Sequence, residues 1–342
     1  MNDARVLVVD DSAAMRALFC DVLEQTRQIE VVGTAANAAE AREQIAQLRP
    51  NVVTLDVEMP GMSGIEFLEE IMSTRPLPVV MLSSLTQRGT ETSLRAYELG
   101  AVECFPKPLK ATPEQFSKTV SKLGKIVLAA ANSNVRDRPR HRDANAQDVP
   151  FSWNGHIAAF SASMGGIDAL TALLGHYPRN CPPTAVILQT EPSLADVFIA
   201  RLDDALKCAV KPALDGAALT QGTVHVAADP ARHVVFEPGQ PPRLRLLERE
   251  PVDGVRPSAN LLFGTIARGG VPAVGAVLTG LGEDGARGLK LMREAGCHTF
   301  AQSRATATVS QAPAAAIALE AAEHELAIDE LAGAVLSSCS TG

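Results

Sequence analysis

Short apolar runs alternate with stretches of helical periodicity along the first 125 residues of the chain. The runs predict strands at 6–9, 29–32, 52–55, 79–82 and 102–105. The periodic stretches predict helices at 13–26, 38–48, 64–74, 90–99 and from 112 onward, with Ser12 as the N-cap of the first. Strands that are apolar on both faces and alternate with helices are typical of a parallel sheet covered on each side. We therefore expect a doubly wound α/β domain with five parallel strands, as in flavodoxin-like folds.

The same alternation returns in the second half of the chain. It predicts strands at 156–160, 184–188, 274–278 and 298–302. It predicts helices at 165–175, 194–207, 257–268, 285–295 and 328–338. Residues 222–248 interrupt this order with closely spaced apolar runs, which indicate a β-hairpin or a small antiparallel insert. The sequence thus predicts a second α/β domain that carries a small antiparallel element.

The stretch 131–150 differs from both halves because it has almost no apolar periodicity and is rich in Arg, Asp, Asn and Pro. This composition is typical of an exposed linker. Its arginines leave two interpretations open, a docking patch or a solvated joint. The predicted organisation is a first domain at 1–125, a linker at 126–152 and a second domain at 153–342.

Composition narrows the class of protein. The chain has 342 residues, 46% of them hydrophobic, which is enough to build two packed cores. Its net charge of −8 argues against DNA binding through bulk charge. It shows no apolar run of bilayer length and no signal-peptide pattern, and its six cysteines form no CxxC pair. We expect a soluble cytoplasmic protein with no disulfide framework, no membrane insertion and no nucleic-acid partner.

Five polar residues follow the predicted strands of the first half. Asp10 and Asp11 follow the first strand and Asp56 follows the third, while Ser83 and Lys107 follow the fourth and fifth. The carboxyl ends of parallel strands meet at one edge of the sheet, so these groups are expected to converge. Clustered carboxylates without His or Cys suit a hard cation such as Mg²⁺. Any one of these acids could instead cap a turn or a helix, but that reading does not explain five suitable groups at one edge.

Four segments of this half, VVDDS, LDVEMPGMSG, MLSSLT and FPKP, resemble a response-regulator receiver domain over residues 5 to about 125. The resemblance implies that Asp56 accepts a phosphoryl group from a histidine kinase. It implies a Mg²⁺ site made by Asp10, Asp11, Asp56 and the backbone carbonyl of Glu58. It also implies that Ser83 and Lys107 contact the phosphoryl group.

Two turns of the second half carry candidate chemistry. Ser163 lies in the segment SASMGG between a predicted strand and a predicted helix, where free N–H groups favour a developing oxyanion. Such a turn also fits a phosphate site or a plain helix start. The segment LTGLGEDG brings Asp284 to another strand end, where an ordinary N-cap is the alternative.

These two turns, with a receiver in front of them, resemble the CheB family of chemotaxis response regulators, which are protein-glutamate methylesterases and protein-glutamine glutaminases. The segments HVAADPARH at 225–233 and RPS at 256–258 add to the resemblance. It implies a three-layer α/β catalytic domain with a Ser-His-Asp triad, acting on methyl-accepting chemotaxis receptors. It assigns Ser163 as nucleophile, Asp284 as triad acid and the backbone N–H of Leu281 as an oxyanion donor.

One position departs from the family pattern. The family places its triad histidine in a Gln-His-x-Pro segment, which here reads Gln189-Thr190-Glu191-Pro192. A threonine hydroxyl is no general base near neutral pH, whereas imidazole is. Two hypotheses follow: a phosphorylation-regulated hydrolase of receptor glutamate esters and glutamines, or a degenerate relative that acts as a phospho-switched binding module or phosphoryl sink. A DNA-binding response regulator is disfavoured, because the second half is too long and too strand-rich for a helix-turn-helix.

Overall fold

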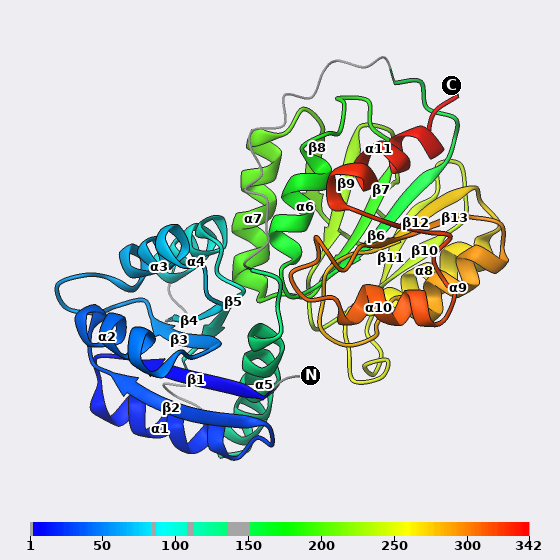
Figure 1. Cartoon of the computed structure of the whole chain (residues 1–342). Coiled ribbons are helices and arrows are strands. Elements are labelled where there is room, and N and C mark those ends of the chain that lie inside the picture. The colour runs from blue at the N-terminus through cyan, green and yellow to red at the C-terminus, as the bar shows by residue number, and fades with distance from the viewer. Residues whose placement is uncertain (1–2, 84–86, 108–112, 136–150, 342) are drawn as a thin grey trace. The chain divides into compact units, whose positions relative to one another are not determined.

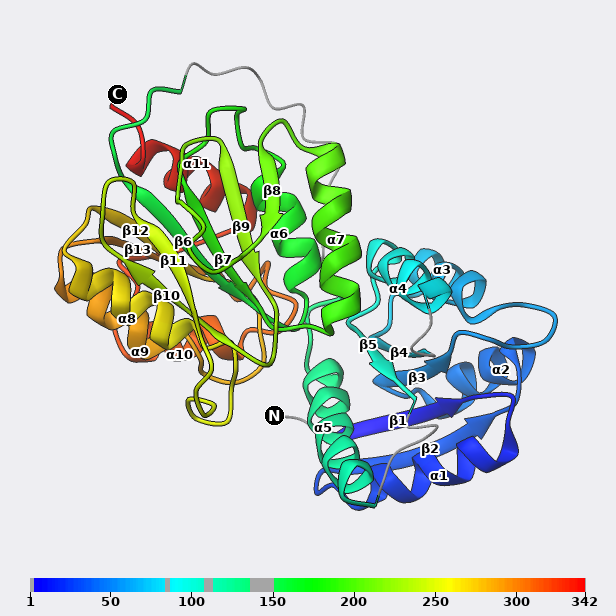
Figure 2. The same cartoon turned by 180° about the vertical axis from the view of Figure 1, so that it is seen from behind.

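The computed structural model describes residues 3–83, 87–107, 113–135 and 151–341, with the side chains of 87–90 and 113–120 left undescribed. The chain divides into two compact units, residues 1–138 and 139–342, called here the N-terminal unit and the C-terminal unit. Figures 1 and 2 show both units from opposite sides. The arginine run of the linker, for which a docking patch and a solvated joint are both open interpretations, lies outside the described residues.

The N-terminal unit contains a five-stranded parallel sheet in the order β2-β1-β3-β4-β5. Its strands are β1 Ala4–Val9, β2 Ile29–Ala35, β3 Val52–Asp56, β4 Val79–Ser83 and β5 Glu103–Pro106. Its helices are α1 Ala13–Glu24, α2 Ala38–Leu48, α3 Gly64–Thr74, α4 Gln87–Leu99 and α5 Pro113–Ala131. Every residue of β3 and β4 is buried, because helices cover both faces of the sheet. Figure 1 shows α1 and α5 on one face and α2, α3 and α4 on the other.

The ends of these helices follow from their sequences. The Ser12 hydroxyl accepts a hydrogen bond from the N–H of Met15, which confirms the predicted N-cap of α1. Helix α5 continues to Ala131, so residues 126–131 are helical and not part of a linker as predicted. The reason is that Ile126, Val127 and Ala130 form a buried face on this last stretch.

The C-terminal unit contains a seven-stranded parallel sheet in the order β14-β13-β12-β6-β7-β9-β8 and a separate hairpin β10-β11. The sheet strands are β6 Ile157–Ala162, β7 Thr184–Leu188, β8 Ala209–Pro212, β9 Thr223–Ala227, β12 Ala273–Val277, β13 His298–Gln302 and β14 His324–Leu326. The hairpin strands are β10 His233–Glu237 and β11 Arg243–Leu247. The helices are α6 Gly166–Leu174, α7 Pro192–Ala205, α8 Ala259–Gly269, α9 Ala286–Glu294, α10 Gln311–Ala318 and α11 Ile328–Ser338.

Three layers build this unit. Figures 1 and 2 show α6, α7 and α11 on one face of the sheet, and α8, α9, α10 and the hairpin on the other. The core of the second face packs Phe263 and Ile266 of α8 against Ile157 and Ala159 of β6. Small Ala and Gly side chains in the central strands allow the helices to approach the sheet closely. At Gly275 of β12, for example, an added Cβ would lie 2.7 Å from a Leu289 side-chain carbon.

Most predicted elements of the second half are confirmed, and the exceptions concern residues 222–248 and three short elements. The antiparallel hairpin is confirmed as β10-β11, joined by a Pro- and Gly-rich loop. The segment 223–227 is not part of this insert, because β9 lies parallel between β7 and β8 with Val224 and Val226 buried. Strands β8 and β14 and helix α10 were not predicted. All six cysteines are free thiols, and no described helix is long and apolar enough to span a membrane.

Candidate functional sites

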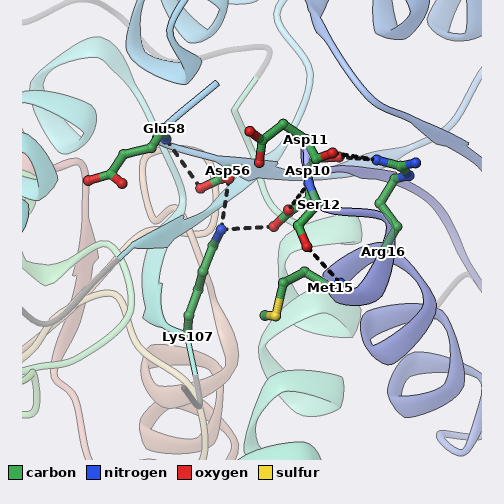
Figure 3. A network of polar contacts seen from close by, with 8 residues as sticks. All are labelled: Asp10, Asp11, Ser12, Met15, Arg16, Asp56, Glu58 and Lys107. Carbon is green, nitrogen blue, oxygen red and sulfur yellow. Dashed lines mark hydrogen bonds and ion pairs between the residues drawn. The ribbon is translucent and has the colours of Figure 1, made fainter. Parts of the chain in front are cut away.

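Three carboxylates meet at the carboxyl edge of the N-terminal sheet (Figure 3). One oxygen from each of Asp10, Asp11 and Asp56 lies within 4.8 Å of the others. Asp10 is fully buried, Asp56 is 3% exposed and Asp11 is exposed. Asp10 and Asp11 follow β1, and Asp56 ends the neighbouring strand β3, so the parallel register brings these residues together.

Lys107 supplies a cation to this cluster. Its Nζ lies 2.8 Å from Asp10 Oδ2 and 2.7 Å from Asp56 Oδ2. Burial raises the pKa of Asp56, and although Lys107 opposes this effect, the pKa stays above its ordinary value. Burial lowers the pKa of Lys107, but its two carboxylate partners outweigh burial and raise that pKa overall. With all four groups ionised, three negative charges face one positive charge, which leaves a net charge of −2 at an oxygen-only site. A divalent hard cation such as Mg²⁺ fits this donor set and this charge.

Hydrogen bonds between side chains and backbone groups hold the ends of β1 and β3 in place. Arg16 donates to the carbonyls of Asp10 and Asp11 at 2.7 and 3.0 Å, and the N–H of Ser12 donates to Asp10 Oδ1 at 2.9 Å. The N–H of Glu58 donates to Asp56 Oδ1 at 3.2 Å (Figure 3). The acceptor groups of these turns are therefore held in place before any ligand arrives.

Ser83 ends β4 on the other side of Asp56. It is buried, and its hydroxyl accepts a hydrogen bond from Ser93 Oγ at 3.4 Å. The N–H of Lys107 donates to the Ser83 carbonyl at 2.9 Å, which fixes these two strand ends side by side. All the side chains predicted to converge at this edge thus lie at the ends of adjacent strands.

In the C-terminal unit, Ser163 lies in a tight turn between β6 and α6. The N–H of Gly166 donates to the Ser163 carbonyl at 2.7 Å. Gly165 has a φ of +77°, and an added Cβ would lie 2.6 Å from the Thr308 side chain. Only glycine fits this position, because both the backbone conformation and the available space exclude a side chain.

A second turn, after β12, is joined to the first. The N–H of Ser163 donates to the Thr279 carbonyl at 3.1 Å, and Thr279 Oγ1 donates to the Met164 carbonyl at 2.9 Å. The N–H of Leu281 donates to Ser163 Oγ at 2.9 Å. This approach requires glycine at position 280, where an added Cβ would lie 2.5 Å from Ser163 Oγ. The serine oxygen therefore rests on a backbone N–H donor that could stabilise a developing oxyanion.

An open pocket surrounds Ser163. Its lining residues are Ser161, Ala162, Ser163, Gln189, Leu278, Thr279, Gly280, Leu281, Asp284 and Ala312. The described lining contains no histidine. Thr190, which the sequence predicts at the histidine position of the family, is not among these residues, whereas its neighbour Gln189 is.

Asp284 accepts four hydrogen bonds. Its Oδ1 accepts from Ser258 Oγ at 2.7 Å and from the Asn260 N–H at 3.1 Å. Its Oδ2 accepts from the Ala259 N–H at 2.7 Å and from Gln189 Nε2 at 2.9 Å. Asp284 thus caps α8, a helix distant in sequence, and not the helix that follows it, which begins after Gly285. Its charge lies at the positive end of that helix dipole.

Three histidines of the C-terminal unit, His176, His225 and His233, have hydrogen-bond partners other than Ser163. The buried His233 accepts from the Ser258 N–H at Nδ1 (3.2 Å), and its Nε2 lies 3.0 Å from the Glu250 carbonyl. His225 Nε2 lies 3.2 Å from the Ala218 carbonyl, and His176 Nδ1 lies 2.9 Å from the Ala172 carbonyl near the end of α6. These contacts are structural, and no described hydrogen bond joins a histidine ring to Ser163 Oγ.

The sequence did not predict that Gln189 lines the pocket of Ser163 and donates a hydrogen bond to Asp284. This residue is the first after β7, and its N–H donates to the Ala162 carbonyl at 3.0 Å beside the Ser163 turn. The signal was its position, since the first residue after a parallel strand lies at the ligand-binding edge. The hydrogen bond from the Ser258 hydroxyl to Asp284 was also not predicted, because Ser258 enters the sequence analysis only within the segment RPS.

The fold and the two sites define a response regulator, in which a receiver domain is followed by an α/β effector domain. The family model for the response regulator receiver domain matches residues 6–121, and that for CheB methylesterase matches residues 158–335. The chain belongs to the CheB methylesterase family. The predicted resemblance and the predicted fold class, two α/β domains with a small antiparallel hairpin, are confirmed.

Individual relatives cover nearly the whole chain. A protein-glutamate methylesterase/protein-glutamine glutaminase 1 from Caulobacter vibrioides is 42% identical, over 99% of each chain. A protein-glutamate methylesterase/protein-glutamine glutaminase from Agrobacterium fabrum is 42% identical, over 97% of this chain and 96% of its own. The crystal structure of the Thermotoga maritima CheB methylesterase catalytic domain covers 54% of this chain and 98% of its own, with a TM-score of 0.52 and 24% identity. That structure supports the fold of the C-terminal unit.

Proposed function

We propose that this chain is a phosphorylation-regulated protein of chemotaxis signalling that acts in the cytoplasm on the γ-carbonyl groups of receptor glutamyl methyl esters and glutamines. The observation that supports this proposal most directly is the Ser163 Oγ to Leu281 N–H contact of 2.9 Å. It pairs a nucleophile with an oxyanion donor in a domain of the CheB methylesterase family.

In this proposal Ser163 Oγ attacks the γ-carbonyl carbon, and the carbonyl oxygen takes the Leu281 N–H as the negative charge develops. As the tetrahedral intermediate collapses, the leaving group takes a proton from solvent and departs as methanol or ammonia, and water then hydrolyses the acyl-serine. Asp284 holds the start of α8 and the side chain of Gln189. Since Thr190 stands at the histidine position, the proton of Ser163 passes to solvent, and we expect this step to limit turnover.

The N-terminal unit supplies the regulation. Asp56 would accept the phosphoryl group of a histidine kinase, and Ser83 and Lys107 would bind its oxygens. Asp10, Asp11, Asp56 and the backbone carbonyl of Glu58 would hold Mg²⁺, which offsets the charge of the carboxylates and of the incoming phosphoryl group.

The test is methanol release from a methylated chemoreceptor and ammonia release from its glutamine form. We expect the wild-type protein, treated with acetyl phosphate and Mg²⁺, to release both products above a Ser163→Ala control. Equal release by the wild type and the control would contradict hydrolysis at this serine.

The alternative function, a phospho-switched binding module or phosphoryl sink, is not favoured, since relatives 42% identical over nearly the whole chain are named protein-glutamate methylesterase/protein-glutamine glutaminase. The variant Thr190→His tests whether the lack of a general base at position 190 limits hydrolysis. General-base catalysis contributes about 10²–10⁴-fold, so we expect kcat to rise about 100-fold or more in this variant if the remaining site is intact. Equal turnover by the wild type and by Thr190→His would contradict the expectation that the lack of a base at position 190 limits the reaction.

A further inference from the structure

The side chain of Gln189 has a fixed orientation in the serine pocket. Its Nε2 lies 2.9 Å from Asp284 Oδ2 and 3.4 Å from the Pro257 carbonyl. Both of these partners are acceptors, so only the NH₂ group of Gln189 can face them. The hydrogen-bonding partners therefore assign which end of this amide is nitrogen and which is oxygen.

This orientation leaves the Gln189 side-chain carbonyl oxygen as an acceptor. Among the described residues no hydrogen bond reaches Gln189 Oε1, and this atom is not one of the buried polar atoms that lack a partner. Gln189 is half-buried and lines the pocket together with Ser163 and Leu281. The pocket thus offers an N–H donor from Leu281 and an accessible carbonyl acceptor from Gln189.

These two groups match a carboxamide better than a methyl ester. The Leu281 N–H serves the carbonyl oxygen of either group. A carboxamide also has an NH₂ that donates to Gln189 Oε1, whereas the ester places a methoxy oxygen there, which is an acceptor facing an acceptor.

We infer that Gln189 makes the serine pocket selective for glutaminyl side chains over glutamyl methyl esters, by accepting a hydrogen bond from the carboxamide NH₂. This inference rests on the proposed function and names the receptor form that the site prefers. Because Gln189 acts through hydrogen bonding to the leaving group, its effect is specific to one substrate form and not common to both.

The experiment measures binding in the full-length Ser163→Ala protein, so that the probes are not consumed. The probes are two synthetic peptides of a chemoreceptor methylation helix that differ only in one side chain, glutamine or glutamate γ-methyl ester. We expect the glutamine peptide to bind about fivefold more tightly, since one hydrogen bond in a half-buried site contributes about 1 kcal/mol.

Adding Gln189→Met should abolish this preference, with Kd values for the two peptides within about twofold of each other. A merely structural role would weaken the binding of both peptides in parallel and leave the ratio of their Kd values unchanged.

The matched control is Gln311→Met. Gln311 accepts a hydrogen bond from the Gly282 N–H of the same turn, and its replacement should leave the ratio of the two Kd values intact. Equal affinity for both peptides before the Gln189 change, or an unchanged ratio after it, overturns the inference and leaves the proposed function standing. Binding of neither peptide contradicts the proposed function and the inference with it.

Discussion

Asp284 is a single residue on which helix α8 and the serine pocket both depend. In Asp284→Ala, the N–H groups of Ala259 and Asn260 and the Ser258 hydroxyl lose their acceptor. We expect the C-terminal unit to lose about 2 kcal/mol of unfolding free energy, the upper range for losing a helix cap. Urea unfolding followed by the fluorescence of Trp153, the one Trp of the chain, measures this change.

The control Glu283→Ala alters an exposed neighbour of Asp284 and should change the free energy of unfolding little. Equal effects of both variants would contradict the capping role.

Asp56 makes a pH-dependent contribution to stability. Burial raises its pKa above the unfolded value, so the ionised carboxylate destabilises the folded state despite its contact with Lys107. This cost is fully present above the raised pKa and is relieved as pH falls through it. In the absence of divalent cations, Asp56→Asn should therefore stabilise the N-terminal unit at pH 7, and the gain should shrink as pH falls. Native-state hydrogen exchange of the buried β3 amides measures it.

The ionised carboxylate of Glu66 contributes to stability with the opposite sign to that of Asp56. Its hydrogen bonds with Ser63 lower its pKa, so its contribution is present above the unfolded pKa and is lost as pH falls through the folded one. Glu66→Gln should lower stability at pH 7 and have less effect in acid. A stability gain in Asp56→Asn that does not change with pH would show that the effect is not electrostatic.

At the scale of elements, the turn from β6 to α6 depends on backbone conformation and space together. Gly165 and Gly282 have similar φ values, +77° and +84°, but only at Gly165 does an added Cβ meet another side chain. Each Ala substitution costs about 1–2 kcal/mol for the left-handed conformation, and Gly165→Ala adds about 1–3 kcal/mol for the clash with Thr308. We expect Gly165→Ala to be the more destabilised of the two variants in Trp153-monitored unfolding. Equal losses would show that Thr308 moves aside at no cost.

The elements that sequence reasoning found are those with strong periodicity or complete burial, such as β3, β4 and β7. Short strands such as β8 and β14 span only four and three residues, too few to give a pattern. Strand β9 alternates like an antiparallel strand, yet it pairs in parallel, because its partners β7 and β8 are set by the tertiary fold. The positions of Ser163 and Asp284 followed from motifs. The contact of Asp284 with α8 did not, since it joins segments that only the fold brings together.

At the scale of the whole molecule, both sites lie at the carboxyl ends of parallel strands, but their electrostatics are opposite. The N-terminal site concentrates three carboxylates around one ammonium, so its charge favours binding of a cation. The serine site places the Leu281 N–H against Ser163 Oγ and holds the Asp284 carboxylate against the N-terminus of α8. In the proposed function one chain would combine a phosphoryl-accepting carboxylate, Asp56, with a nucleophilic serine, Ser163, and regulation would require a coupling free energy between the two sites.

That coupling can be measured in the full-length protein through Asp56. Acetyl phosphate with Mg²⁺ should change product release from receptor peptides, or the affinity for them, because an added phosphoryl group replaces a carboxylate–ammonium contact with a more negative group. Asp56→Asn removes the accepting carboxylate, and chelation by EDTA removes the cation that offsets the acidic cluster, so either change should abolish the response. Glu58→Gln is the matched control, since only the backbone of this residue is expected at the metal site and the response should persist. A response to acetyl phosphate of unchanged size in Asp56→Asn would place the regulatory phosphorylation elsewhere in the chain.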